Sequence, residues 1–173
     1  MCGIAGWFGP NGLEQAPSEV IDRMLARIKH RGPDGRGVAS LPAGMGMLGH
    51  LRLAIIDPDG GVQPVWSQDR RSVLVFNGEI YNYRELRERM SGAGIAWRTH
   101  SDSEVLLELL RHEGTEALSL LRGMYAFAYW DGERQLALLA RDPTGIKPLF
   151  LRQAGDTLWF ASEAKAFPPT AEW

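Results

Sequence analysis

Cys2 is the only cysteine among the 173 residues, and it directly follows Met1. Its small side chain favours removal of Met1, which would leave a free α-amino group on the residue that carries the thiol. An α-amine has a reference pKa of roughly 7.7–8.0, so near neutral pH it can take up the thiol proton. The apolar Gly3-Ile4-Ala5-Gly6 that follows suits a buried strand. Cys2 is therefore a candidate nucleophile with its own amine as general base.

A nucleophile that attacks a carbonyl needs hydrogen-bond donors for the developing oxyanion, and Asn77-Gly78 is the candidate pair. The dipeptide alone favours a hairpin turn. In the other interpretation, the Asn77 amide and the Gly78 backbone N–H both point at the oxyanion. Glycine suits that role because backbone without a Cβ can approach a substrate closely.

Arg52 and Asp102 could recognise the two charged ends of a free α-amino acid. Arg52 interrupts the apolar Leu51-Arg52-Leu53-Ala54-Ile55-Ile56, where it is either an exposed-face residue or a buried ligand for a carboxylate. Asp102 follows Ser101 at a helix start, where it either complements the helix dipole or binds an ammonium group.

Composition narrows the class of protein. Hydrophobic residues make up 45% of the chain and charged residues 23%, as in a globular domain with a full core. The net charge of −2, without a basic stripe, argues against nucleic-acid binding. The four histidines share no zinc-like spacing, and no apolar run approaches the ~18 residues of a membrane span. With one cysteine and no signal-peptide pattern, we expect a cytoplasmic protein without a metal site.

The predicted elements alternate between strands and helices within one domain, residues 1–173. Apolar spacing predicts helices over 17–29 and 83–90, and Ser101-Asp102-Ser103-Glu104 is a capping box that starts a third. Strand-like runs cover 2–8, 45–56, 72–77, 124–130, 135–140, 148–152 and 157–161. Short connections in the last four runs favour antiparallel pairing, so the fold class is α+β with layered sheets and helices.

The motifs resemble the glutaminase domain of class II (N-terminal-nucleophile) glutamine amidotransferases, asparagine-synthetase type, from Cys2 to about Lys165. The matching segments are Cys2-Gly3-Ile4, His30-Arg31-Gly32-Pro33-Asp34-Gly35, Gly49-His50-Leu51-Arg52-Leu53, Phe76-Asn77-Gly78-Glu79-Ile80-Tyr81-Asn82, Ser101-Asp102-Ser103-Glu104, Gly123-Met124-Tyr125-Ala126-Phe127-Ala128, Arg141-Asp142, Gly145-Ile146-Lys147-Pro148 and Ala161-Ser162-Glu163. Each segment is weak alone, and their order and spacing together are specific.

The resemblance implies a four-layer αββα sandwich with two antiparallel sheets between helices. It implies Cys2 as nucleophile and Asn77 and Gly78 as the oxyanion hole. It also implies Arg52 on the glutamine carboxylate, Glu79 and Asp102 at the amino-acid end, and backbone of Leu53, Ala54, Ile55 and Ile56 along the pocket. L-Glutamine would be hydrolysed through a glutamyl thioester without a cofactor in this domain. ATP and Mg would act on a synthetase unit that receives the ammonia, because no ATP-binding loop occurs in this chain.

Two other hypotheses remain. A non-catalytic module could use the same pocket to bind glutamine or to dock a partner. A different amide hydrolase with a terminal nucleophile could act on an acyl amide, although the paired Arg52 and Asp102 would have no use there. Turnover of glutamine, lost on Cys2→Ala, separates the first hypothesis from these two.

Overall fold

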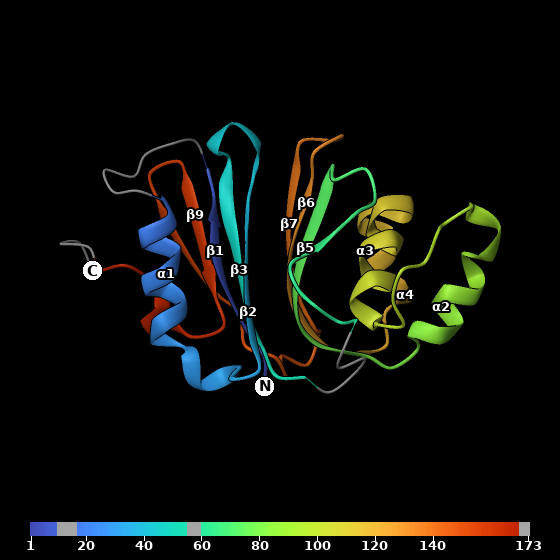
Figure 1. The fold of residues 1–173 in the computed structure, drawn as a ribbon, viewed down its shortest axis with the longest axis horizontal. Coiled ribbons are helices and arrows are strands. Elements are labelled where there is room, and N and C mark those ends of the chain that lie inside the picture. The colour runs from blue at the N-terminus through green and yellow to red at the C-terminus, as the bar shows by residue number, and fades with distance from the viewer. Residues whose placement is uncertain (10–16, 55–59, 170–173) are drawn as a thin grey trace.

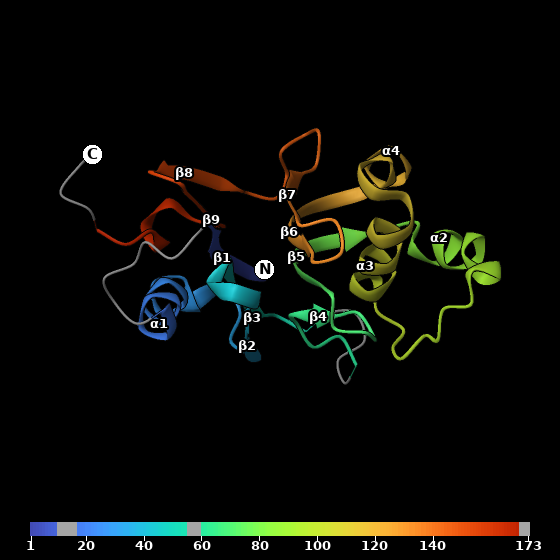
Figure 2. The ribbon, with the colours of Figure 1, turned by 90° about the horizontal axis from the view of Figure 1, so that it is seen from above.

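The computed structural model describes residues 1–9, 17–54 and 60–169. Two antiparallel β-sheets lie face to face, with helices on the outer face of each (Figure 1). Seen from above, α1 covers one sheet while α2, α3 and α4 lie beyond the other (Figure 2). The N-terminus lies at one end of the layer between the two sheets (Figure 1). This arrangement confirms the predicted αββα order.

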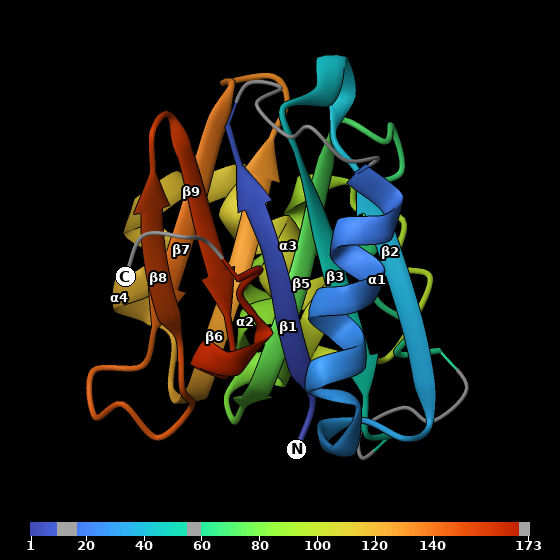
Figure 3. The same cartoon turned by 90° about the vertical axis from the view of Figure 1, so that its left-hand side faces the viewer.

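The first sheet has the strand order β2-β3-β1-β9-β8, and α1 packs across its outer face (Figure 3). Its strands are β1 (Gly3–Phe8), β2 (Gly35–Ser40), β3 (Gly46–Arg52), β8 (Phe150–Ala154) and β9 (Thr157–Ala161). Helix α1 spans Pro17–Arg27. The central position of β1, paired with β3 on one side and β9 on the other, fixes the N-terminal segment inside the molecule.

The second sheet has the order β4-β5-β6-β7. Its strands are β4 (Val65–Trp66), β5 (Ser72–Ile80), β6 (Gly123–Asp131) and β7 (Leu136–Arg141). The helices on its side are α2 (Tyr83–Arg89), α3 (Asp102–Glu113) and α4 (Ala117–Leu120). Short 3₁₀ turns are η1 (Lys29–Arg31), η2 (Pro42–Gly44), η3 (Ser91–Ala93), η4 (Gly114–Glu116) and η5 (Ala164–Ala166).

Three apolar layers hold the sandwich together, and the period of two along each strand separates them. In β5, Leu74 and Phe76 pack toward α3, whereas Val73 and Val75 face the other sheet. The third layer joins α1 to the outer face of the first sheet. Residues two apart on a strand therefore share a layer, which decides where polar residues at the strand ends point.

The structure corrects several predicted elements. Strands β2 and β4 and helix α4 were not predicted. The glycines of β2 obscured its pattern, and a Cβ on Gly37 would lie 2.1 Å from the Gln63 carbonyl oxygen. The four strands predicted over 124–161 do form two antiparallel hairpins, but β6–β7 belongs to one sheet and β8–β9 to the other.

The capping box at the start of α3 forms only in part. Ser101 Oγ accepts the Glu104 backbone N–H at 3.3 Å, as predicted. The Glu104 carboxylate, however, accepts the backbone N–H groups of Arg98 and Thr99, at 3.1 and 2.8 Å, and not that of Ser101. The Ser101 N–H instead donates to Thr99 Oγ1 at 3.3 Å.

Candidate active site

Strand alternation brings Cys2, Arg52 and Asn77 to one end of the layer between the sheets. The inner-face core contains Ile4 of β1, Leu48 of β3 and Val75 of β5. Residues an even number of positions apart on a strand point to the same face. Cys2 lies two residues before Ile4, Asn77 two after Val75, and Arg52 four after Leu48, so all three side chains point between the sheets. For Arg52 this orientation favours the buried-ligand interpretation over the exposed-face one.

A cavity of about 60 Å³ lies at this end of the sandwich. Among the predicted residues, its lining includes Cys2, Arg52, Leu53, Asn77, Gly78, Glu79 and Asp102. Ala54 is not part of the lining, and its backbone N–H donates to the Asp34 carboxylate at 2.9 Å. Ile55 and Ile56 lie outside the described residues. Met1, Gln63 and Lys147 also line the cavity, and no role was predicted for Gln63 or Lys147.

The Cys2 thiol is held at the cavity wall by Leu53. The Leu53 backbone N–H donates to Sγ at 3.3 Å, and the thiol lies 3.5 Å from the Leu53 carbonyl oxygen. An N–H donor directed at sulfur stabilises a developing thiolate. The thiol therefore lies in a defined position, not on a frayed terminus.

A second group of residues anchors the backbone around Cys2. Arg31 Nε donates to the Cys2 carbonyl oxygen at 2.9 Å, and its Nη1 pairs with Glu163 at 3.0 Å. Ser162 Oγ accepts the Ile4 N–H at 2.9 Å. Burial alone would raise the pKa of Glu163, but hydrogen bonds from Arg31, Lys165 and His30 lower it to about 2. Arg31, Ser162 and Glu163 fall in matching motifs, but only the fold shows that they hold the nucleophile's strand.

Asn77 and Gly78 lie inside β5, opposite Ala126 and Tyr125 of β6, so the hairpin-turn interpretation is wrong. The Asn77 side chain is 1% exposed, and its Nδ2 has no hydrogen-bond partner among the described residues. A buried N–H₂ group without a partner costs free energy, which a bound oxygen atom would recover. Gly78 has a packing reason to be glycine, because a Cβ there would lie 2.2 Å from the Met124 carbonyl oxygen.

The backbone N–H of Gly78 faces the free edge of β5. N–H groups of alternate residues point to the same side of a strand. On that side, Phe76 N–H donates to Gln63 Oε1 at 2.6 Å, and Ile80 N–H donates to Asp102 Oδ2 at 3.0 Å. The N–H of Gly78 lies between these two bonds and next to the cavity that Asn77 also lines. One side-chain amide and one backbone N–H are therefore available as candidate donors to an oxyanion.

Asp102 is a buried carboxylate in an unfavourable setting for its charge. It is 5% exposed, and burial raises its pKa to about 6 against the opposing hydrogen bonds from Ile80, Ser103 and its own N–H. The charge of Glu79, on the same cavity wall, raises the pKa further. The place of Asp102 in the first turn of α3 agrees with the helix-dipole role. Because its ionised form is unfavourable when buried next to Glu79, the site is suited to a cationic ligand.

No three His, Cys, Asp or Glu side chains within the described ranges gather into a possible metal site. None of the helices described is long and apolar enough to cross a membrane. One cavity is thus lined by a thiol, a side-chain amide, a strand-edge glycine, a guanidinium and two carboxylates.

Comparisons with known proteins show the family of the chain. A family model described as "Glutamine amidotransferase domain" matches residues 1–173. The chain is 45% identical over 168 residues to the glutamine-hydrolysing asparagine synthetase 1 of Bacillus subtilis (strain 168), covering 96% of this chain and 26% of that protein. It is 39% identical over 173 residues to the glutamine-hydrolysing asparagine synthetase 2 of Arabidopsis thaliana, covering 99% of this chain and 29% of that protein.

A solved structure has the same fold. The glutamine phosphoribosylpyrophosphate amidotransferase of B. subtilis, complexed with ADP and GMP, aligns with a TM-score of 0.77 and 28% identity over 95% of this chain and 42% of that one. The likeness confirms the predicted sandwich of N-terminal-nucleophile hydrolases. The chain spans between 26% and 29% of the length of the two curated relatives described above.

Proposed function

Because this chain belongs to the glutamine amidotransferase domain family and is similar to glutamine-hydrolysing asparagine synthetases, we propose that it hydrolyses L-glutamine to glutamate and ammonia at Cys2. One observation carries the proposal: the Cys2 thiol and the unpaired Asn77 amide line one cavity, together with Arg52 and Asp102. A nucleophile with an oxyanion donor specifies acyl transfer. A guanidinium and a buried carboxylate beside them suit a free amino acid.

Removal of Met1 is the first requirement of this mechanism. Met1 itself lines the cavity, whose volume of about 60 Å³ is well below the ~300–1,000 Å³ of ordinary small-molecule pockets. Its removal would enlarge the space next to the thiol and free the Cys2 α-amine. That amine would then lie on the same residue as the thiol and serve as its general base.

The reaction divides into two acyl-transfer steps. The α-amine takes the thiol proton, and sulfur attacks the side-chain carboxamide carbon of glutamine. The tetrahedral oxyanion is held by Asn77 Nδ2 and Gly78 N–H, and its collapse breaks the C–N bond while the amine delivers the proton to the leaving ammonia. Water, deprotonated by the same amine, then attacks the thioester and releases glutamate and the free thiol.

Charged groups on the cavity wall would bind the amino-acid end of the substrate. Arg52 would pair with the α-carboxylate of glutamine, with the backbone of Leu53 alongside. Asp102 and Glu79 would receive the α-ammonium group. Pairing with this cation would relieve the unfavourable burial of the Asp102 charge.

The ammonia would pass to an ATP-dependent, asparagine-synthetase-like amidating unit. The relatives named as asparagine synthetases extend well beyond the part that this chain matches, which supports such a unit. We propose that this domain needs no cofactor of its own, and that ATP and Mg act on the amidating unit. A reducing compartment such as the cytoplasm would keep the single catalytic thiol active.

Glutamine turnover tests the proposal directly. The intact protein, purified without an N-terminal tag, is incubated with L-glutamine, and glutamate and ammonia are quantified while mass spectrometry checks for the loss of Met1. We expect turnover that Cys2→Ala abolishes, and a variant that retains Met1 should be equally inactive. Equal ammonia release by wild type and Cys2→Ala would refute the catalytic role, and glutamine binding without turnover in processed protein would support a binding module.

A further inference from the structure

The free edge of β5 is partly occupied by a side chain. Strand β4 pairs with β5 only through Val65 and Trp66, opposite Leu74 and Val73. At Phe76 the Gln63 side chain takes over. Its Oε1 accepts the Phe76 N–H at 2.6 Å, and its Nε2 donates to the Phe76 carbonyl oxygen at 3.0 Å.

Gln63 therefore substitutes for one residue of a neighbouring strand. A carboxamide carries the same N–H donor and C=O acceptor as a peptide group, so both polar groups of Phe76 are satisfied as in a ladder. Unlike a strand, the side chain ends there. The next N–H on this edge, that of Gly78, stays open toward the cavity, and the following one, of Ile80, is taken by Asp102.

His50 strengthens the same contact from the opposite sheet. Its Nε2 lies 3.2 Å from the Phe76 carbonyl oxygen, and because a carbonyl only accepts, Nε2 carries the proton. Burial lowers the pKa of His50 to about 3, so the ring is neutral. Its buried Nδ1 has no partner within the described chain, as fits the deprotonated nitrogen.

The position of Gln63 is itself set by packing. The side chain is 8% exposed and lies in the wall of the active-site cavity. Its backbone carbonyl occupies the space beside Gly37 of β2 that a Cβ would fill. Gln63 is thus held between the first sheet and β5, where it spans the two layers.

We propose that Gln63 is a positioning residue for the oxyanion donors, which rests on the proposed function of glutamine hydrolysis. It fixes the Phe76 peptide one residue before Asn77 and two before Gly78, and Asp102 fixes β5 two residues after Gly78. Between these two supports the Gly78 N–H and the Asn77 amide face the substrate carbonyl. The oxyanion forms in the transition state and is absent from the bound substrate. Loss of the Gln63 contacts should therefore lower kcat more than it raises KM.

Two substitutions at Gln63 test this role through pH. Gln63→Glu keeps both hydrogen bonds to Phe76 when its carboxyl group is protonated, but directs a carboxylate at the Phe76 carbonyl when ionised. We expect kcat, relative to wild type at each pH, to fall about ten- to a hundredfold at pH 8 and to recover as the pH is lowered. Gln63→Met cannot form either bond and should stay low at every pH. Gln68→Met, at an exposed glutamine of the connection between β4 and β5, is the matched control and should equal wild type.

Thermal melting of each variant, together with the KM, separates positioning from other roles. Folded Gln63 variants with wild-type kcat would overturn the proposal, as would a change confined to KM, which would indicate direct substrate contact. Amide hydrogen exchange gives a readout without turnover: Phe76 N–H should be protected in wild type and exchange faster in Gln63→Met. If wild type fails to hydrolyse glutamine, the proposed function fails, and unchanged Phe76 exchange would separately refute the support by Gln63.

Discussion

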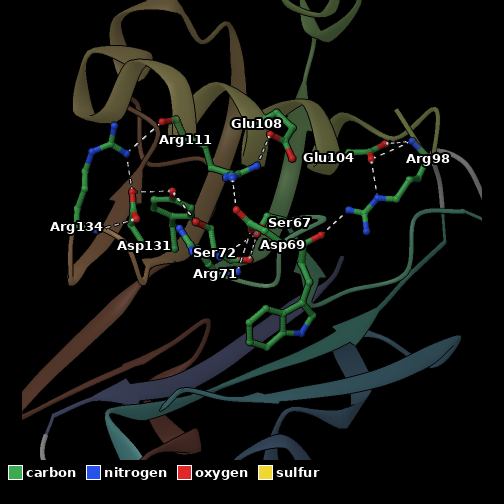
Figure 4. A network of polar contacts seen from close by, with 12 residues as sticks. Ser67, Asp69, Arg71, Ser72, Arg98, Glu104, Glu108, Arg111, Asp131 and Arg134 are labelled. Carbon is green, nitrogen blue, oxygen red and sulfur yellow. Dashed lines mark hydrogen bonds and ion pairs between the residues drawn. The ribbon is translucent and has the colours of Figure 1, made fainter. Parts of the chain in front are cut away.

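The two ends of β5 differ in how far their polar side chains are satisfied by hydrogen bonds and ion pairs. At the Ser72 end, the charged side chains and the hydroxyls of Ser72 and Tyr129 are paired in a continuous network (Figure 4). Asp131 accepts from Tyr129 Oη at 3.2 Å and from Arg134 Nη1 at 2.7 Å. Arg111 joins Asp69 at 2.8 Å to Glu108 at 3.0 Å. At the other end, Asn77 keeps a buried amide without a described partner, and Gly78 faces an open edge.

The carboxylates at the two ends differ in the same sense. Burial alone would raise the pKa of Asp131, but the hydrogen bonds from Arg134 and Glu133 lower it below its ordinary value. Burial of Asp102, with fewer compensating contacts, raises the pKa of that carboxyl to about 6. The folded chain stabilises the Asp131 charge, whereas the Asp102 charge would be stabilised by a bound cation.

This contrast shows that cavity size is a poor guide to the site. The hollow beside the Ser72 network measures about 330 Å³, against about 60 Å³ at Cys2. Among the described residues, the buried side-chain atoms without partners are Arg31 Nη2, His50 Nδ1, Asn77 Nδ2 and Trp130 Nε1. None belongs to the network around the larger hollow, while Asn77 lines the smaller one. The unsatisfied Asn77 amide therefore supports the smaller hollow as the candidate site, although the larger hollow has more volume.

The largest expected effect is on catalysis at Asn77. Asn77→Ala should lower kcat by about 10²–10³-fold, the usual effect of losing one oxyanion donor, with a small change in melting temperature because Nδ2 has no hydrogen-bond partner among the described residues. Asn82→Ala is the matched control. That buried asparagine donates to the Leu120 carbonyl and accepts the Arg122 N–H, both at 3.0 Å, so its loss should lower stability and leave kcat intact. Equal kcat in wild type and Asn77→Ala would remove the contrast between the two ends.

The next effect is on stability at Asp131. Asp131→Ala should lower the free energy of unfolding at pH 7 by about 1–3 kcal/mol, because it removes the acceptor of the buried Tyr129 hydroxyl and of partly buried donors on Glu133 and Arg134, while kcat per folded molecule stays unchanged. The pKa of this carboxyl is lowered on folding, so its contribution is present above the ordinary aspartate pKa of roughly 3.9 and is lost as the pH falls. Urea unfolding at pH 7 and pH 3 checks both statements. A large loss of kcat in folded protein would contradict them.

The smallest effect concerns Asp102 and pH. Protonation of Asp102 removes the charge that would bind the substrate ammonium, so KM for glutamine should rise about tenfold as the pH falls from 7 to 5, across the pKa of about 6. Asp102→Asn should have a high KM without this pH step. Folding raises this pKa, so the ionised group destabilises the protein at neutral pH, and the variant should be more stable at pH 7 by up to about 3 kcal/mol. A wild-type KM that does not change between pH 5 and 7 would contradict the ammonium role.

Most of the individual site residues were predictable because each is a reactive or charged residue at an unusual position among its sequence neighbours. Cys2 follows Met1, Arg52 interrupts an apolar run, and Asp102 follows a helix cap. The structure brings these three into one cavity with Asn77 and Gly78. Their roles as nucleophile, donors and ligands stay proposals that the variants above test.

Residues that act through other residues could not be predicted. Gln63 lies in a connection without periodicity, and its function as a strand substitute depends on where β4 stops pairing with β5. Arg31 and Glu163 are 132 residues apart and meet only because β9 pairs with β1. Strand β2 was missed because its glycines serve close packing and give no apolar alternation.

The sequence by itself determined the local features: strand and helix periods, the Ser101 cap, and a thiol that processing can place beside a free amine. These depend on residues within a few positions of one another. The tertiary structure decided that Asn77-Gly78 continues a strand and does not turn, because β6 pairs with it along its whole length. It also decided which buried polar groups are satisfied, since a hydrogen bond depends on partners from distant segments. These distant partners satisfy the polar network at the Ser72 end of β5 and leave Asn77 and Gly78 open at the end that faces Cys2.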